Sequence, residues 1–178
     1  MNIYKNLNIK ENHKNSVIAI GNFDGLHLGH QKVLNQARLK AKKENLKFGV
    51  ITFEPIPNMF FNKNVKYHRI NSIEQKKYYL NKLKLDFLII INFNKSFSNI
   101  SADHFISKIL VAKIKSKYIY VSQNFRFGKK RLGNTKILKF LEKKHSYKTI
   151  ITFPYQKNKK IISSSLIRKK ICEGNIVE

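Results

Sequence analysis

The chain has 178 residues, which is long enough for one domain with a sizeable hydrophobic core. Hydrophobic residues make up 42% of it and aromatic residues 12%, which is typical of a folded globular protein and argues against a disordered one. No apolar run approaches the roughly 20 residues needed to cross a bilayer, and residues 1–14 lack the apolar core of a signal peptide. We expect one cytoplasmic domain over residues 1–178, with no membrane partner.

The formal net charge is +26, a value that suggests nucleic-acid binding because lysines placed on phosphates release counterions. Only five of the 36 basic residues are arginines, and the lysines are spread along the chain together with many Asn and Ile residues. This distribution is typical of coding bias in an AT-rich genome. Because no nucleic-acid-binding motif accompanies the charge, we expect weak attraction to polyanions and no specific nucleic-acid partner.

Apolar runs indicate strands at residues 16–21, 48–53, 87–91, 118–121 and 149–153, with a short one at 161–162. Helical periodicity predicts helices at residues 30–43, 72–84, 101–111, 136–144 and 166–172, and Ser72 and Ser101 are plausible N-caps. The side chains expected to face the core are Val33, Leu34, Ala37 and Ala41 in the first helix, and Ile73, Tyr79, Leu80 and Leu83 in the second.

Alternation of strands and helices predicts an α/β fold, an open, doubly wound, Rossmann-like parallel sheet of about five strands with flanking helices. Ligands of such sheets bind beyond the carboxyl ends of the strands. Four polar loops are expected at that edge, at residues 22–29, 54–57, 122–133 and 163–165. Two prolines make residues 54–57 unsuitable for a helix or a central strand. The sequence therefore predicts a ligand site where these loops meet.

The segment GNFDGLHLGH, residues 21–30, links a buried strand to a helix. Gly25 and Gly29 allow a sharp turn and a close approach to a ligand, and the start of the helix favours an anion. His27 and His30 lie about one turn apart, so both can face one phosphate and stabilise charge developing on phosphorus. Their spacing also fits a metal pair, but no further cysteine or histidine pair completes a metal site. We favour phosphate contact, and we predict no metal held by side chains.

The same segment resembles the (H/T)xGH signature of nucleotidyltransferases, in the form found in bacterial FAD synthetases. Residues 53–57 (FEPIP) resemble the FEPxP loop of that family, and residues 122–128 (SQNFRFG) resemble its G-x-D/N-F-x-F-G loop. Residues 162–168 (ISSSLIR) are similar to its ISSTxIR motif. The resemblance extends from about residue 17 to the end of the chain. It points to the FMN adenylyltransferase module of the bifunctional riboflavin kinase/FAD synthetases.

That resemblance implies an enzyme that transfers AMP from ATP to FMN, giving FAD and pyrophosphate, with Mg²⁺ accompanying ATP. It implies that catalysis depends on His27, His30, Asn124, Ser164 and Arg168. The residues it implies for ATP binding are Gly21, Asn22, Phe23, Asp24, Gly25, His27, Gly29, His30, Ser163, Ser164 and Arg168. The residues it implies for flavin binding are Phe53, Pro55, Pro57, Phe61, Asn124, Phe125 and Phe127. Core packing is an equal explanation for Phe125 and Phe127.

The chain departs from the family pattern at a few positions. Ser122 replaces a glycine and is expected to strain its turn, and Ser165 replaces a threonine. Ile161 stands where a basic residue often precedes the ISS sequence, with Lys159 and Lys160 just before it. We expect no riboflavin kinase domain in residues 1–178, so the chain is either a stand-alone FAD synthetase or part of a longer enzyme.

Two alternatives remain open at the level of sequence. One is another nucleotidyltransferase of the same HxGH type that acts on a different phosphorylated acceptor. The other is a non-catalytic, basic nucleotide- or RNA-binding relative, which would account for the net charge.

Overall fold

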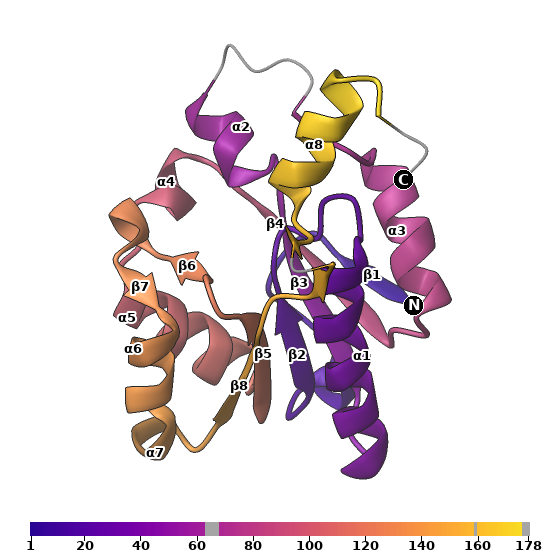
Figure 1. Ribbon diagram of the computed structural model, residues 1–178. Helices are drawn as coiled ribbons and strands as arrows, with labels where there is room; N and C mark the ends of the chain where they lie inside the picture. The colour runs from indigo at the N-terminus through magenta and orange to yellow at the C-terminus, as the bar shows by residue number, and fades with distance from the viewer. Residues whose placement is uncertain (63–67, 159, 176–178) are drawn as a thin grey trace.

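The computed structural model of the chain describes residues 1–62, 68–158 and 160–175. Its centre is a six-stranded sheet in the order β1-β4-β3-β2-β5-β8, in which every neighbouring pair is parallel (Figure 1). The strands are β1 (Asn2–Tyr4), β2 (Val17–Ile20), β3 (Phe48–Glu54), β4 (Phe87–Asn92), β5 (Tyr118–Ser122) and β8 (Lys148–Thr152). The predicted Rossmann-like α/β fold is confirmed.

The sheet has one strand more than the five or so expected. The additional strand is β1, which pairs with β4 at the edge of the sheet, Ile3 opposite Leu88. Asn2 and Ile3 are exposed and Tyr4 is half-buried, so β1 carries none of the continuous apolar character that marks the inner strands. An edge strand of this kind leaves little signal in the sequence.

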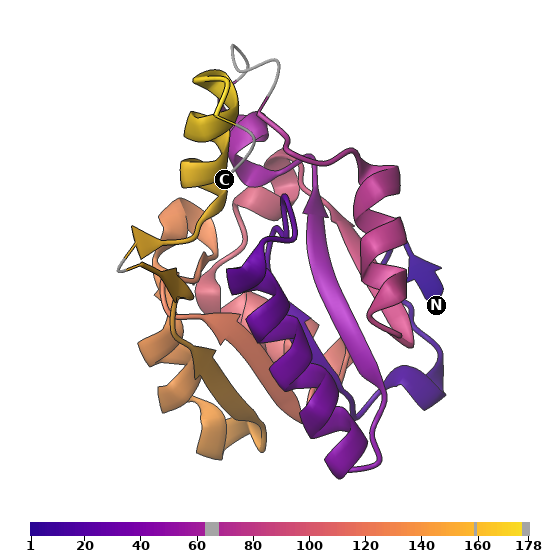
Figure 2. The same ribbon diagram turned by 45° about the vertical axis from the view of Figure 1, so that its right-hand side comes forward.

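Helices cover both faces of the sheet (Figures 1 and 2). On one face, α1 (Leu28–Lys43) and α3 (Ile73–Lys82) contribute to a hydrophobic core that contains Val17 and Ala19 of β2. On the other face, the π-helix η2 (Phe105–Lys113) and α6 (Thr135–Phe140) contribute to a second core that contains Ile18 and Ile20. Alternate residues of β2 therefore belong to different cores, as the two-residue period of a strand requires.

The predicted core positions of α1 are confirmed, since Val33, Leu34, Ala37 and Ala41 are all buried. In α3 the prediction is wrong for Tyr79, which is 45% exposed. Lys76 occupies the inward position instead and is 2% exposed, together with the buried Leu80.

The other predicted helices are present with different boundaries. Ser101 caps α5 (Ala102–His104), which continues as η2, and the helix expected at residues 136–144 is divided into α6 and α7 (Glu142–His145). The C-terminal helix α8 (Ser164–Cys172) begins two residues earlier than expected. The remaining elements are η1 (Glu11–His13), α2 (Pro57–Phe61), α4 (Lys95–Ser98), η3 (Lys129–Arg131), and the pairs β6 (Arg126–Phe127) with β7 (Gly133–Asn134) and β9 (Gln156–Lys157) with β10 (Lys160–Ile161).

The prediction that residues 54–57 avoid helix and central strand is wrong at both ends. Glu54 is the last residue of β3 and pairs with Asn92 of β4. Pro57 is the first residue of α2, where the missing N–H of proline costs no helical hydrogen bond. The loop is therefore reduced to Pro55 and Ile56.

The order of the strands shows where a ligand can enter the sheet. From β2 the chain proceeds outward through β3 to β4, and it then returns to place β5 on the other side of β2. The direction of winding thus reverses between β2 and β5, and open α/β sheets bind ligands at the carboxyl ends of such a pair. Among the described residues, no helix is both long enough and apolar enough to cross a membrane.

We predict that Gly49→Ala destabilises the fold by about 2 kcal/mol, because overpacked cores lose roughly this much. A Cβ atom at Gly49 would lie 2.3 Å from Cζ of Phe87, its neighbour on β4. Urea denaturation of the variant measures the loss. The double variant Gly49→Ala/Phe87→Leu should lose less than the sum of its single changes, and strict additivity would contradict the steric explanation.

Candidate active site

The segment between β2 and α1 forms the floor of the site at the carboxyl edge of the sheet. Phe23 and Leu26 are buried in left-handed conformations, with φ values of 46° and 37°. Gly25 has φ of 83°, a conformation that a residue with a Cβ atom would adopt only with strain. These turns lead the chain directly into α1, whose N-cap residue is His27.

The structure brings His27 and His30 together, as the sequence predicts. Their rings stack with centroids 3.7 Å apart, and the ring of Phe23 packs edge-on against His30 at 5.4 Å. Nδ1 of each histidine is buried and has no hydrogen-bond partner among the described residues. Gly29 lies under the ring of His27, where a Cβ atom would approach the ring to 3.1 Å. Both histidines are half-buried, so the pair is packed against the protein and is still partly open to a ligand.

Burial keeps both imidazoles neutral. It lowers the pKa of His27, although the Asp24 carboxylate opposes the effect. Burial lowers the pKa of His30 to about 3, and the nearby imidazole of His27 and the ammonium of Lys76 add to the effect. At neutral pH the pair can therefore offer neutral N–H donors, and not an imidazolium, to a phosphate.

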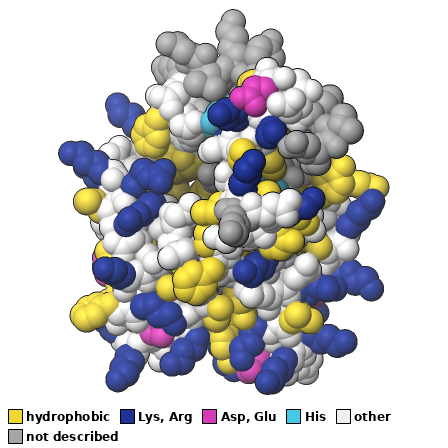
Figure 3. Space-filling model, viewed as in Figure 1, with side chains coloured by type: hydrophobic (Ala, Val, Ile, Leu, Met, Phe, Trp, Pro, Cys, Tyr) yellow, Lys and Arg dark blue, Asp and Glu magenta, His cyan; other side chains and the backbone are white. Residues whose placement is uncertain are grey.

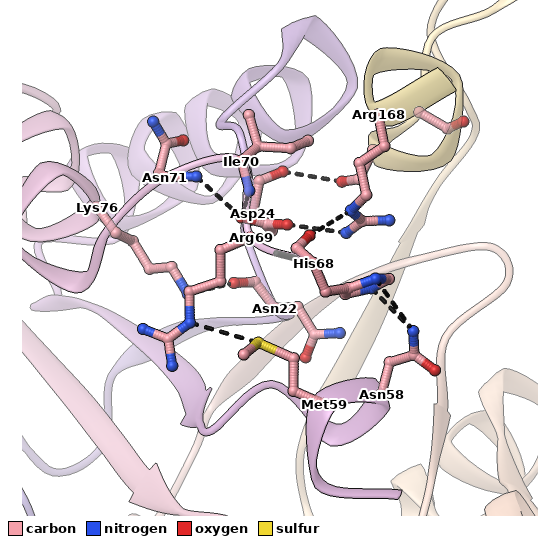
Figure 4. A network of polar contacts seen from close by, with 12 residues as sticks. Asn22, Asp24, Asn58, Met59, His68, Arg69, Ile70, Asn71, Lys76 and Arg168 are labelled. Carbon is pink, nitrogen blue, oxygen red and sulfur yellow. Dashed lines mark hydrogen bonds and ion pairs between the residues drawn. The ribbon is translucent and has the colours of Figure 1, made fainter. Parts of the chain in front are cut away.

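Asp24 connects three separate parts of the chain and is 1% exposed (Figure 4). Its Oδ1 accepts hydrogen bonds from the amides of Ile70 at 3.0 Å and Asn71 at 3.3 Å. Its Oδ2 lies 2.8 Å from Nη2 of Arg168 in an ion pair. Nε of Arg168 donates to the carbonyl of His68 at 2.6 Å. Asp24 is thus an anchor for residues 68–71 and for α8, although the sequence assigned it to ATP contact.

The serines before Arg168 join the same network. Ser163 is the N-cap of α8 and accepts from the amide of Leu166, and Oγ of Ser164 donates to the carbonyl of Asp24 at 2.8 Å. The N-terminus of α8 is therefore fixed beside the segment that begins α1. Two helix N-termini that meet in this way favour an anion between them.

Residues 68–71 were not identified from the sequence, yet they contact both the segment between β2 and α1 and the region around the end of β3 and α2. Arg69 forms an ion pair with Glu54 at the end of β3, and its Nε lies 3.4 Å from the sulfur of Met59 in α2. The imidazole of His68 lies 2.9 Å from the side-chain amide of Asn58. The segment thereby links α2 to the Asp24 network.

The residues expected to bind the flavin form part of one aromatic cluster. Phe53 contacts Phe93 and Phe97, and Phe93 contacts Phe61, which is 63% exposed. Phe53 is buried in the core, so its ring packs inside the protein, whereas Phe61 is available at the surface. Pro55 and Pro57 are half-buried beside these rings.

A second group of expected flavin ligands follows β5. Phe125 and Phe127 stack with centroids 5.4 Å apart, and Phe127 is buried against Phe105. Asn124 is exposed and its Oδ1 accepts from Oγ of Ser122 at 2.9 Å. Ser122 ends β5 in extended backbone, so the strain expected from losing a glycine is not found there. Core packing accounts for Phe127, and Phe125 remains half-buried.

The described residues contain no group of three His, Cys, Asp or Glu side chains that could hold a metal ion. The carboxylates of Asp24 and Glu54 are both engaged, Asp24 with Arg168 and Glu54 with Arg69. Of the basic positions before residues 162–168, Lys160 is exposed in β10, and Lys159 lies outside the described residues.

We predict that Asp24→Asn costs about 3 kcal/mol of stability, because it leaves the partly buried guanidinium of Arg168 without its counter-charge. The surface pair of Glu11 with Lys14 provides the control, and Glu11→Gln should leave the stability close to that of the wild type. Urea denaturation measures both. Equal effects of the two variants would show that the Asp24 network is dispensable.

We also predict that stability falls as the pH drops from 6.5 toward 3. His30 has a folded pKa of about 3 against an ordinary value of 6.5, so the unfolded chain takes up its proton first. The loss attributable to one such group is about 1.4 kcal/mol per pH unit. His30→Asn should flatten this slope, and the same change at the exposed His104 should not. Parallel slopes for wild type and His30→Asn would refute the assignment.

Comparison with known proteins supports the family resemblance of the sequence motifs. The FAD synthetase family model matches residues 9–166. The bifunctional riboflavin kinase/FMN adenylyltransferase of Buchnera aphidicola subsp. Schizaphis graminum is 42% identical over 170 residues, which cover 95% of this chain and 54% of that protein. The protein of the same name from Escherichia coli K12 is 30% identical over 160 residues, 90% of this chain and 51% of its own length.

Among solved structures, one described as a macrolide-efflux protein from Streptococcus pneumoniae superposes with a TM-score of 0.82 at 26% identity. The match covers 98% of this chain and 58% of that one. The chain spans about half the length of the curated relatives it matches. Neither alternative left open by the sequence is favoured by these matches. The chain belongs to the FAD synthetase family.

Proposed function

We propose that this domain transfers AMP from ATP to FMN, giving FAD and pyrophosphate. The observation that carries the proposal is the stacked pair of neutral histidines at the start of α1, with buried, unpartnered Nδ1 atoms beside the N-terminus of α8. In the reaction, a phosphate oxygen of FMN attacks the α-phosphorus of ATP. The bond from that phosphorus to the bridging oxygen breaks, and pyrophosphate leaves with the electron pair.

On this proposal the histidines stabilise negative charge without gaining or losing a proton. An N–H of His27 and of His30 donates to the oxygens of the α-phosphate, whose charge grows in the transition state. The first amides of α1 and α8 lack partners within their helices and bind the remaining phosphates. Ser163, Ser164 and Arg168 contribute from α8, and Gly21, Asn22, Gly25 and Gly29 give the nucleotide a close approach to the backbone.

FMN is proposed to bind on the other side of the reacting phosphorus. Phe61 and Phe125 offer accessible aromatic surface for the isoalloxazine ring, with Pro55 and Pro57 at the edge. Phe53 and Phe127 support these rings from the core. The exposed amide of Asn124 is placed to orient the FMN phosphate.

Mg²⁺ is proposed to arrive with ATP. The carboxylates of Asp24 and Glu54 are already paired with arginines, so the side chains fit a metal held by phosphate oxygens and water. When bound, the ion supplies charge neutralisation on the polyphosphate. Lysine and arginine side chains are scattered over the face seen in Figure 3, which favours a general attraction for anions over a dedicated nucleic-acid surface.

The direct test mixes the purified domain with ATP, Mg²⁺ and either FMN or riboflavin and measures FAD by chromatography. We expect FAD to form in the mixture that contains FMN and not in the mixture that contains riboflavin. His27→Ala and His30→Ala should each lower the rate about 100-fold or more, the usual cost of removing a transition-state donor. His145→Ala, at the last residue of α7 and just before the amino end of β8, should retain wild-type activity. Turnover with another phosphorylated acceptor but not with FMN would rule out the flavin assignment.

A further inference from the structure

Lys76 is a buried basic side chain that the proposed reaction does not use. It projects from the inward face of α3, is 2% exposed, and donates from Nζ to the carbonyl of Asn22 at 2.9 Å (Figure 4). Asn22 belongs to the segment between β2 and α1 that is proposed to bind the nucleotide. Lys76 of α3 therefore contacts the backbone that forms the floor of the site.

The ammonium group of Lys76 has no carboxylate partner among the ion pairs of the described residues. The arginines nearest to it do, since Arg69 pairs with Glu54 and Arg168 pairs with Asp24. The carbonyl of Asn22, which accepts the hydrogen bond from Lys76, is neutral. A buried ammonium without a counter-charge is costly, so such groups are usually paired or bound to an anion. The free protein thus holds a positive charge that lacks its complement.

The charged groups that influence Lys76 come from the segment between β2 and α1, from the end of β3 and from residues 68–71. Burial lowers the pKa of Lys76, the carboxylates of Asp24 and Glu54 oppose that effect, and Arg69 adds to it. The positive charge of Lys76 in turn contributes to the low pKa of His30 on α1. Lys76 is thus within electrostatic reach of the histidine pair, where the ATP phosphates are expected, and of Glu54 at the end of β3, beside the expected flavin site.

We propose that Lys76 is a positioning residue of the nucleotide site, which fixes the Asn22 carbonyl and stores a buried positive charge whose counter-ion is the polyphosphate of the nucleotide. It acts through the backbone of Asn22 and through space, without touching the reacting atoms. Its charge also favours the neutral form of His30, so the histidines can donate while the cation balances the phosphates. The proposal rests on the proposed function only in taking a nucleoside triphosphate as the ligand.

The chain offers a matched control for the two parts of this role. The Asn22 carbonyl accepts a second hydrogen bond, from Oγ1 of Thr52 at 3.1 Å. Thr52→Val removes that donor and leaves the charge, whereas Lys76→Met removes the charge and leaves the carbonyl with a partner. Lys77→Met, one position further along α3, changes the net charge by the same amount away from Asn22.

The experiment measures ATP affinity by calorimetry and thermal unfolding without ATP for the wild type and these three variants. Lys76→Met should bind ATP about tenfold or more weakly, the expected effect of one partly screened charge. It should melt at or above the wild-type temperature without ATP, because replacing an uncompensated buried charge by an apolar side chain is neutral or stabilising. Thr52→Val and Lys77→Met should stay within about threefold of the wild-type affinity.

Wild-type affinity in Lys76→Met, or an equal loss in Thr52→Val, would overturn the proposal. If Lys76→Met fails to fold, Lys76→Arg decides the matter, because arginine keeps its charge at every accessible pH. The ATP affinity of the wild type should then decrease as the pH rises, and the decrease should begin at a pH below the ordinary lysine pKa of 10.5. The Lys76→Arg protein should lose less ATP affinity over the same pH range. Identical pH profiles would overturn the proposal. Absence of FAD formation would reject the proposed function alone, since this test measures ATP binding and not turnover.

Discussion

The ion pair between Asp24 and Arg168 is the interaction on which the site depends. It joins the segment between β2 and α1 to α8, and the amides of Ile70 and Asn71 bring a third segment to the same carboxylate. The histidine pair and the N-terminus of α8 owe their relative position to this contact. A carboxylate that accepts several charge-assisted bonds in a buried place holds its partners more firmly than a surface pair would.

Around that anchor, charge is distributed by type. The side chains nearest the expected reaction, His27 and His30, are neutral because burial disfavours their protonated forms. The two arginines are neutralised by carboxylates, and a lysine behind the loop retains an unmatched charge. Such an arrangement offers the ligand hydrogen-bond donors that are either neutral or already balanced by a carboxylate. It lets the ligand itself complete the electrostatic balance of the protein.

The sequence predicted most of the fold and the close approach of His27 and His30, whereas the roles of residues in ATP and flavin binding stay predictions. Alternating strands and helices indicated the sheet, and the contact of Gly29 with His27 shows why the HxGH segment requires a glycine there. β1 was missed because an exposed edge strand needs no apolar run. Lys76 was missed because lysine is usually exposed, although its spacing of four from Leu80 placed it on the buried face of α3.

The hydrogen-bond and ion-pair partners of Asp24 could not be predicted from the sequence for a different reason. Arg168 is 144 positions away from Asp24 and Ile70 is 46 positions away. Periodicity and motif spacing describe local structure, and neither specifies which distant groups share one carboxylate. The same limit explains why Asp24 was assigned to the ligand and not to the anchor.

The distance along the chain between Asp24 and Arg168 also affects how the protein is made. Residues 17–43 can emerge from the ribosome and form β2 and α1 long before residue 168 has been synthesised. Until then, Asp24 lacks its cation and the carbonyl of Asp24 lacks the hydroxyl of Ser164. A nascent chain would therefore hold the HxGH segment without the contacts that fix it. The proposed nucleotide site is therefore complete only when α8 docks on the segment between β2 and α1.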